Sequence, residues 1–269
     1  AQATKATAAQ SKLKQIAKLH TIEIEHPLKN VRIRIPPPEN SKGVALYARE
    51  LVIGYPNKRV AEHIACEVNR GDHVAILGDN GQGKSTLLKT LAGEIPAIDG
   101  TMRWFAKARV AYYAQHVQQM LPTHLTVQEY LTKTAEVTIL PQDILRMAGN
   151  FLFSDDDLEK PISVLSGGER ARLCLAGILL KRHSVLLLDE PTNHLDVETV
   201  EALGVALHEF PGTIIFISHD RTFVNQIANI IFEVRNGEIK RFPGTYQDYI
   251  YHLEQAAEEE TKERSTKTI

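Results

Sequence analysis

The sequence has few of the residues that stabilise small secreted or membrane-spanning proteins. Only two cysteines, Cys66 and Cys174, occur in 269 residues, at no metal-ligand spacing and inside apolar stretches. This excludes a disulfide framework and predicts buried free thiols in a reducing compartment. The longest apolar run, Leu173 to Leu180, is far shorter than the ~18 residues of a membrane span. The first residues are alanine, glutamine and lysine without an apolar core, so we expect no secretory signal and a cytoplasmic protein.

An excess of charge of one sign is also lacking overall, because the formal net charge is −2. The global balance therefore neither favours nor excludes a nucleic-acid partner. The distribution is uneven: residues 1–35 carry a surplus of five positive charges, whereas the last residues are rich in glutamate. The chain does not begin with methionine, which suggests a trimmed chain or an excised part of a longer one.

The basic N-terminal region has a helical pattern. Its apolar positions are spaced three and four apart, as in a heptad seam; they are Ala6, Ala9, Leu13, Ile16 and His20. Such a helix could pack on its own domain with a solvated basic face, or extend as an arm toward an anionic partner, and the pattern favours neither. Pro36-Pro37-Pro38 cannot continue a helix and predicts a stiff linker, with a domain boundary near residue 43.

The most informative stretch is Gly78-Asp79-Asn80-Gly81-Gln82-Gly83-Lys84-Ser85-Thr86, between an apolar run (His73 to Leu77) and a predicted helix (Ser85 to Ala92). Glycine, four residues, then glycine, lysine and serine is the pattern of a phosphate-binding loop. Glycines let backbone N–H groups turn around phosphate oxygens, and the helix directs its positive dipole end at the same anion. Lys84 would reach the β/γ-phosphates, and the Ser85 hydroxyl suits Mg²⁺. The strand-loop-helix context argues against an accidental glycine-rich turn.

Apolar runs that alternate with helical patterns predict an α/β fold. Continuous apolar runs are typical of parallel strands buried on both faces, and Asn236-Gly237 between two further runs predicts a hairpin. A more polar region, Pro122 to Lys160, has a helical pattern. The predicted strands, besides His73 to Leu77, are Val44 to Ile53, Val60 to Val68, Arg109 to Tyr113, Val185 to Leu188, Thr213 to Ile217, Ile230 to Arg235 and Glu238 to Arg241.

One of these strands ends in two carboxylates, Asp189 and Glu190. Asp189 at the strand tip would help to hold magnesium through water. Glu190 could act on the attacking water as general base or as an orienting group. A polar strand cap is the structural alternative, and the phosphate-binding loop upstream argues against it.

A second glycine motif, Leu165-Ser166-Gly167-Gly168-Glu169, precedes a predicted helix, Arg170 to Lys181. Ser166 and Glu169 have the spacing of a capping box, so a structural role is available. Two glycines at the first turn do not favour a helix, since each costs about 1 kcal/mol relative to alanine. Their use would be to leave N–H groups open to an anion.

Together these motifs resemble the ATP-binding cassette (ABC) family, over Val44 to Tyr249. The resemblance implies a P-loop α/β fold with a mixed sheet, an antiparallel β subdomain and a helical signature subdomain at about residues 116–183. It implies ATP and Mg²⁺ as ligands, and ATPase activity with Glu190 and His219 as catalytic residues. Tyr55 would stack on adenine, and Gln115 would join Ser85 and Asp189 at the metal. The signature residues are Ser166, Gly167, Gly168 and Glu169, and the D-loop residues are Asn193, His194, Leu195 and Asp196.

Further runs are similar to the F subfamily of soluble cassette proteins: Asp189 to Asp196, Ser218-His219-Asp220-Arg221 with Phe223, and Phe242 to Tyr249. Members carry two cassettes joined by a charged helical linker, which in many reaches toward transfer RNA on the ribosome. Only one cassette is present here. The chain resembles the second half of such a protein: linker end (1–43), cassette (44–250) and charged tail (251–269).

The resemblance implies an ATPase that needs a second cassette, in the same protein or in a second copy, and a translation factor with ribosome, rRNA and tRNA as partners. The motor subunit of a membrane transporter is the alternative, although no membrane insertion is expected of the chain itself. An ATP-switched binding clamp also fits the motifs. A DNA-repair or chromosome-organising cassette is disfavoured, because no long coiled coil lies between Gln115 and Leu165.

Overall fold

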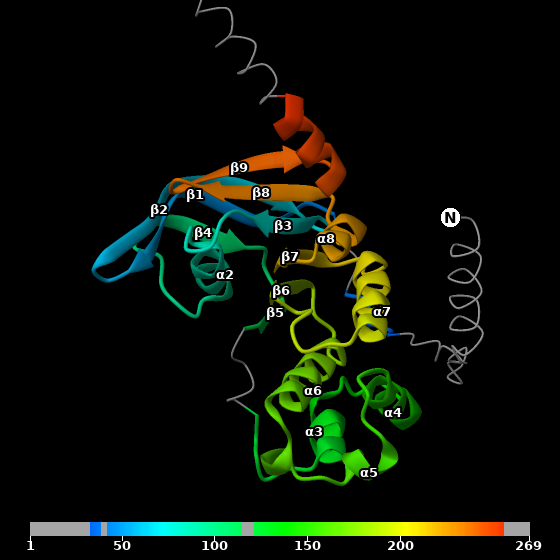
Figure 1. The fold of residues 1–269 in the computed structure, drawn as a ribbon. Coiled ribbons are helices and arrows are strands. Elements are labelled where there is room, and N and C mark those ends of the chain that lie inside the picture. Colours follow the sequence, from blue (N-terminus) through cyan, green and yellow to red (C-terminus); the bar gives the residue numbers. More distant parts are fainter. Residues whose placement is uncertain (1–32, 39–41, 115–120, 256–269) are drawn as a thin grey trace, which may run out of the picture. The chain divides into compact units, whose positions relative to one another are not determined.

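The computed structural model describes residues 33–38, 42–114 and 121–255, and all structural statements below concern these ranges. The predicted heptad helix and Gln115 lie outside them. The described residues are built around one large sheet, with a smaller sheet and a helical region beside it (Figure 1).

The large sheet is six-stranded, in the order β5-β6-β7-β3-β8-β9. The first five strands are parallel and β9 is antiparallel to β8. The α/β prediction is thereby confirmed, as is the hairpin, whose turn residues Asn236 and Gly237 have φ of 53° and 80°. The strands are β3 (His73–Leu77), β5 (Val110–Tyr113), β6 (Val185–Asp189), β7 (Thr213–Ile217), β8 (Ile230–Arg235) and β9 (Glu238–Pro243).

The smaller sheet is antiparallel, in the order β2-β1-β4, and its strands are β1 (Val44–Tyr55), β2 (Lys58–Asn69) and β4 (Asp99–Trp104). The sequence predicted β1 and β2 but not β4. The segment Asp99-Gly100-Thr101-Met102-Arg103-Trp104 has little β-branched character and no buried residue. Pairing with β1 makes it a strand, and that long-range contact leaves no local signal.

Two hydrophobic cores lie on opposite faces of the large sheet, because successive strand residues alternate between faces. Leu186 and Leu188 of β6 point into one core, which contains helices α6, α7 and α8. Val185 and Leu187 point into the other, which contains α2 and the inner face of the smaller sheet. This explains why β6 and β7 are apolar throughout: both of their faces are covered.

The helices are α2 (Lys84–Ala92), α3 (Val127–Thr134), α4 (Pro141–Asn150), α5 (Asp155–Leu158), α6 (Gly167–Leu179), α7 (Val197–His208) and α8 (Arg221–Ile227), with a 3-10 turn, η2 (Ile162–Val164). The prediction for α6 was wrong in its bounds. The helix begins at Gly167 because Ser166 caps it, so both glycines lie inside the first turn. Residues 246–255 are also helical. Within the described ranges, no helix is long and apolar enough to cross a membrane.

Residues 33–38, here called the strap, run in an extended conformation beside the helical region. Ile33 is 5% exposed and belongs to the core that contains α6, and Ile35 packs against the same core. The two isoleucines alternate with the exposed Arg34, the period-two pattern of an extended segment with one buried face. The domain boundary near residue 43 stays a prediction.

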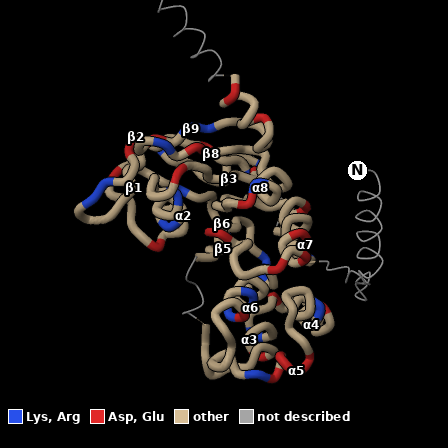
Figure 2. The backbone as a smooth tube through the Cα atoms, viewed as in Figure 1, with Lys and Arg blue, Asp and Glu red and all other residues tan. Residues whose placement is uncertain are grey.

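Charges of both signs are interspersed along the described chain rather than gathered by sign (Figure 2). Cys66 and Cys174 are free thiols, and burial raises the pKa of each to about 11. Cys174 is buried as predicted, whereas Cys66 on β2 is partly exposed.

Candidate active site

The glycine-rich loop Gly78–Thr86 follows β3 and leads directly into α2. Gly83 has φ of 101°, the left-handed region that favours glycine, and a Cβ there would clash with the Val60 side chain. Gly78 is equally restricted, because a Cβ at that position would clash with the carbonyl of Val234. The two glycines are therefore required by the way in which β2 and β8 hold the loop.

The N-terminus of α2 is left open by its own cap residue. Gly83 has no side chain to accept from the first N–H groups, and no acidic residue lies in the first turn. The free N–H groups and the helix dipole make this end of α2 suited to an anion. The Lys84 side chain folds back over the loop, where Nζ donates to the carbonyls of Gly78 (2.7 Å) and Asp79 (3.0 Å). Burial lowers the pKa of Lys84, while the carboxylates of Glu190, Asp79 and Asp189 oppose that effect.

The carboxylate Asp189 lies next to this loop because β6 and β3 are both neighbours of β7. The carboxyl ends of parallel strands meet at one edge of the sheet, the usual place for a ligand in such folds. Asp189 is 2% exposed, and its Oδ1 accepts a 3.3 Å hydrogen bond from Ser85 Oγ.

These two oxygen atoms fit the requirements of Mg²⁺. Magnesium takes one or two protein oxygens and completes its octahedron with waters and substrate phosphates. Within the described ranges, no group of three or more His, Cys, Asp or Glu side chains is placed to hold a metal ion. Ser85 and Asp189 could hold Mg²⁺ together with water and substrate phosphates, because their oxygens lie beside the phosphate-binding loop.

Glu190 follows the strand in a left-handed backbone conformation, with φ of 53°. Its N–H donates to the carbonyl of Ile217 (3.0 Å), and its Oε2 accepts from the N–H of His219 (3.3 Å). The His219 ring lies 3.4 Å from Oε1 and is 66% exposed, whereas the Glu190 side chain is 9% exposed. Burial raises the pKa of Glu190, and the contacts with His219 oppose the rise. A carboxylate with a raised pKa, held at the end of β6, is suited to accept a proton from water.

A cavity of about 340 Å³ brings these groups together. It contains residues of the loop and the start of α2, both carboxylates, His219 and Tyr55. Tyr55 is 44% exposed at the end of β1, where its ring is available for stacking. Sequence reasoning missed Lys58 and Val60, which also line the cavity. They reach it because β2 pairs with β1 after a tight turn, and neither belongs to a recognisable motif.

The signature residues do not line this cavity. Ser166 caps α6: its hydroxyl accepts from Glu169 N (3.3 Å), and Glu169 Oε2 accepts from Ser166 N (2.7 Å). The predicted capping box is confirmed. Hydrogen bonds from Ser166 lower the pKa of Glu169, so the carboxylate stays ionised at this end of the helix. Ser166 and Gly167 are nevertheless exposed and accessible to another molecule.

The D-loop residues lie between β6 and α7 and contact the signature. His194, with φ of 69°, approaches Gly168, since a Cβ built on that glycine would lie 3.7 Å from the His194 Cβ. Leu195 packs on the core, Asn193 is exposed, and Asp196 caps α7 by accepting from Thr199 N (3.0 Å). Asp196 therefore has a structural role that the motif alone did not indicate.

Comparison with known proteins agrees with this geometry. Residues 61–193 match the ABC transporter family. The chain is 38% identical to "Probable ATP-binding protein YbiT" of Escherichia coli O157:H7, over 93% of this chain and 47% of that protein. It is 35% identical to "ABC transporter F family member 5" of Arabidopsis thaliana, over 96% of this chain and 37% of that protein. The chain is an ABC cassette of the F subfamily.

This F-type cassette spans less than half the length of the curated relatives just named. Its fold is also that of solved ABC ATPases. "Structure of ATP binding subunit of ABC transporter" superposes with a TM-score of 0.64 at 23% identity, covering 78% of this chain and 93% of that one. The similarity confirms the predicted P-loop fold of the ABC type.

Proposed function

We propose that the cassette binds ATP with Mg²⁺ in the 340 Å³ cavity and hydrolyses it with Glu190 as the catalytic base. The observation that carries the proposal is the meeting of three strand ends, where the phosphate-binding loop, the carboxylates and His219 face one cavity.

Each residue has a distinct part in the proposed reaction. The open N-terminus of α2 and Lys84 bind the phosphates, and the Tyr55 ring stacks on the base. Ser85 and Asp189 hold the metal, and Mg²⁺ when bound neutralises charge on the phosphate oxygens. Glu190 orients the attacking water and takes its proton, while His219 keeps the glutamate in place.

We further propose that the active site is completed by a second cassette. The signature lies outside the cavity, although its exposed glycine-rich helix end is itself suited to an anion. A head-to-tail pair would bring the signature of one copy to the nucleotide of the other, closing both sites at once. In the whole protein the second cassette would come from the same chain, and two copies of this one could substitute for it.

The whole protein would be a translation factor acting on ribosomes. Membership of the F subfamily and the surplus of positive charge in residues 1–35 support this. Lysines along one segment would bind RNA phosphates and release their counterions. A transporter motor would instead need apolar docking to a membrane-embedded partner.

Two variants test the nucleotide site. Lys84→Ala should weaken ATP binding, because it removes the cation at the phosphates. Glu190→Gln should bind ATP normally, turn over at least about a hundredfold more slowly, and associate into dimers when ATP is present. ATP binding, hydrolysis at several protein concentrations and sedimentation with and without ATP would be measured together. Unchanged hydrolysis by Glu190→Gln would exclude this residue as the base, and a monomer with high, concentration-independent specific activity would exclude the composite site.

Co-sedimentation tests the ribosome proposal. The longer protein should pellet with ribosomes in an ATP-dependent manner, and its affinity should fall as salt rises. The slope of log affinity against log salt concentration counts the phosphates that are contacted. Replacing Lys5, Lys12, Lys14 and Lys18 with glutamine should reduce that slope by an amount that corresponds to up to about four phosphate contacts. Recovery with membranes instead of ribosomes would support a transporter subunit.

A further inference from the structure

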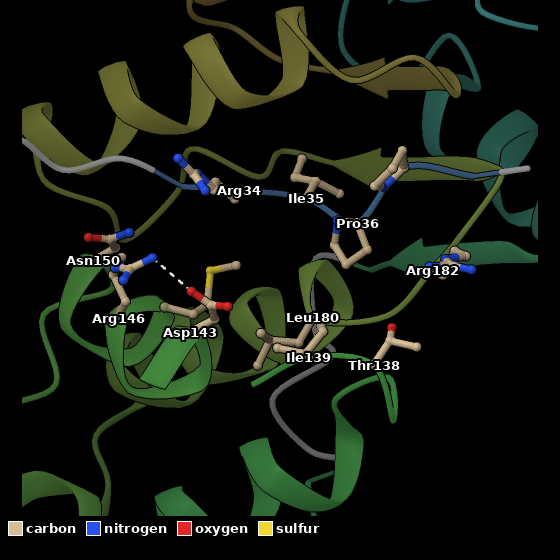
Figure 3. Close-up of a pocket in the computed structure, with 12 residues that line it drawn as sticks. Arg34, Ile35, Pro36, Thr138, Ile139, Asp143, Arg146, Asn150, Leu180 and Arg182 are labelled. Atoms are coloured by element: carbon tan, nitrogen blue, oxygen red, sulfur yellow. Dashed lines mark hydrogen bonds and ion pairs between the residues drawn. The ribbon is translucent and has the colours of Figure 1, made fainter. Parts of the chain in front are cut away.

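A second cavity, of about 390 Å³, lies away from the nucleotide site, between the strap and the helical region (Figure 3). Its walls come from three places: the strap residues 34–37, the segment from Thr138 into α4, and the residues that follow α6. It shares no lining residue with the nucleotide cavity. Its size is that of a site for a small molecule.

Part of the cavity wall is apolar. Ile35 and Pro36 form the strap side, and Ile139, Met147 and Leu180 form the opposite side. Met147 and Leu180 are 3% and 2% exposed, so this surface is anchored in the core and is fixed in shape. Such a surface favours a ligand with an apolar body.

The polar part of the lining is predominantly cationic. The lining contains three guanidinium groups, from Arg34, Arg146 and Arg182, and one carboxylate, Asp143; Arg34 and Arg146 lie at one end of the cavity and Arg182 at the other (Figure 3). Asp143 already accepts a 2.7 Å hydrogen bond from Arg146, as Figure 3 shows, which leaves two arginines without a balancing acid in the lining.

Arg182 has the clearest unmet requirement. Its Nε is buried and has no hydrogen-bond partner in the protein. The hydrogen bonds of the nearby Glu136 go to other donors: its Oε2 accepts from the Arg109 guanidinium (2.9 Å) and from the backbone N–H of Arg182 (3.2 Å), not from this Nε. A buried donor without a partner is costly, so a ligand oxygen at this position would be favourable.

We propose that this cavity binds a small amphipathic anion, a molecule with an apolar body and one carboxylate or phosphate group. The apolar body would lie between Pro36 and Leu180. The anionic group would be bound by Arg182 at the end of the cavity beyond Pro36, since a guanidinium group matches the geometry of carboxylate and phosphate.

A ligand in this cavity would affect the cassette, because the cavity lies between the strap and the end of α6. The helix α6 begins at the signature, and the chain passes from its end through Arg182 to β6 and the catalytic carboxylates. A ligand in the cavity would brace the end of α6 against the strap, which directly follows the basic N-terminal region. It would thus stabilise one position of the helical region relative to the segment that precedes the cassette.

The test uses the 269-residue chain with saturating ATP and Mg²⁺, which keeps probes out of the nucleotide site. 1-Anilinonaphthalene-8-sulfonate, an aromatic anion, reports binding by fluorescence. It should be displaced by octyl phosphate or octanoate, but at least about tenfold less effectively by octan-1-ol, which lacks the charge. The relative potency of octyl phosphate and octanoate distinguishes a phosphate from a carboxylate ligand.

Variants place the binding site. Arg182→Gln should weaken displacement by octyl phosphate at least about tenfold. Arg103→Gln, an exposed arginine of β4 that removes the same charge elsewhere, should not. Arg182→Lys keeps the charge but loses the Nε donor and the planar group, so it serves where Arg182→Gln does not fold and should also weaken displacement. Failure of the dye to bind, equal displacement by octan-1-ol, or equal affinity in all three variants would overturn the proposal.

Discussion

Two helix N-termini in this chain resemble each other in sequence but differ in how they are capped. Both lie in glycine-rich motifs, yet the N-cap of α2 is a left-handed Gly83 with no side-chain cap, whereas Ser166 and Glu169 cap α6 through a reciprocal pair of hydrogen bonds. The first end faces a cavity that contains Lys84 and two carboxylates. The second is exposed and has its own acidic residue in the first turn.

The difference separates two kinds of anion site. At α2, uncapped N–H groups and a buried lysine make a site that is preorganised within one cassette. At α6, the capping box satisfies part of the helix end until another surface arrives. The proposed composite site follows from this asymmetry, because each cassette has one complete phosphate-binding loop and one helix end available to a partner.

The largest expected effect comes from adding a side chain at the α2 end. Gly83→Ala forces a left-handed alanine against Val60, and we expect it to destabilise the fold by about 1–3 kcal/mol and to abolish tight ATP binding. Gly81→Ala is the control, because Gly81 has φ of 83° but open space at the Cβ position. Urea unfolding and nucleotide titration would measure both variants, and equal losses would show that contact with Val60 is unimportant.

Adding a methyl group at the N-terminus of α6 should lower hydrolysis without lowering the stability of the fold. Gly168→Ala meets only an ordinary contact with His194 and gains up to about 1 kcal/mol of helix propensity. We expect normal ATP binding by the monomer, but hydrolysis at least about tenfold slower, because the methyl group would obstruct the partner's nucleotide. Gly149→Ala in α4, with open space around it, is the matched control. Hydrolysis unchanged in both would mean that no nucleotide approaches α6.

The smallest effect concerns the charge of Glu190, which lines the cavity that the N-terminus of α2 faces. Burial raises the pKa of Glu190 in the folded state, so the proton is held more tightly there than in the unfolded chain. The stability linked to this proton is present below the unfolded pKa and is lost as pH rises through the folded one. Glu190→Gln should therefore have a higher Tm than the unmodified protein at pH 7.5, by about 2–4 °C for each kcal/mol gained in the free energy of unfolding. The difference in Tm between the two proteins should disappear near pH 3.5. A lower Tm at pH 7.5 would show that the contacts with His219 outweigh burial.

Much of the fold could be predicted from the sequence because the apolar runs are short and well separated. The predicted bounds of β3 and β7 coincide with the observed ones, and the capping box was predicted from Ser166 and Glu169. The elements that depend on long-range pairing could not be found. The strand β4 needs β1, and the contact of Val60 with the phosphate-binding loop needs the strand pair that carries it there.

The candidate site shows the same division. The phosphate-binding loop, the carboxylates and His219 belong to motifs that can be recognised along the sequence. Lys58 also lines the cavity, but no motif around it indicates this. The strap was predicted as a linker, because three prolines indicate only a stiff segment. The burial of Ile33 against the core that contains α6 depends on tertiary structure that the proline pattern does not encode.

The place of β3 within the sheet has a consequence for the protein during its synthesis. The strand that carries the phosphate-binding loop has β7 and β8 as its only neighbours in the described sheet, and the loop's Gln82 Oε1 accepts from Asn236 N (3.1 Å). These partners leave the ribosome about 150 residues after β3, which at ordinary elongation rates is a delay of roughly 8–30 s. Throughout that interval the nascent chain contains the loop sequence without a site, so a chain truncated before β8 would be unable to bind nucleotide.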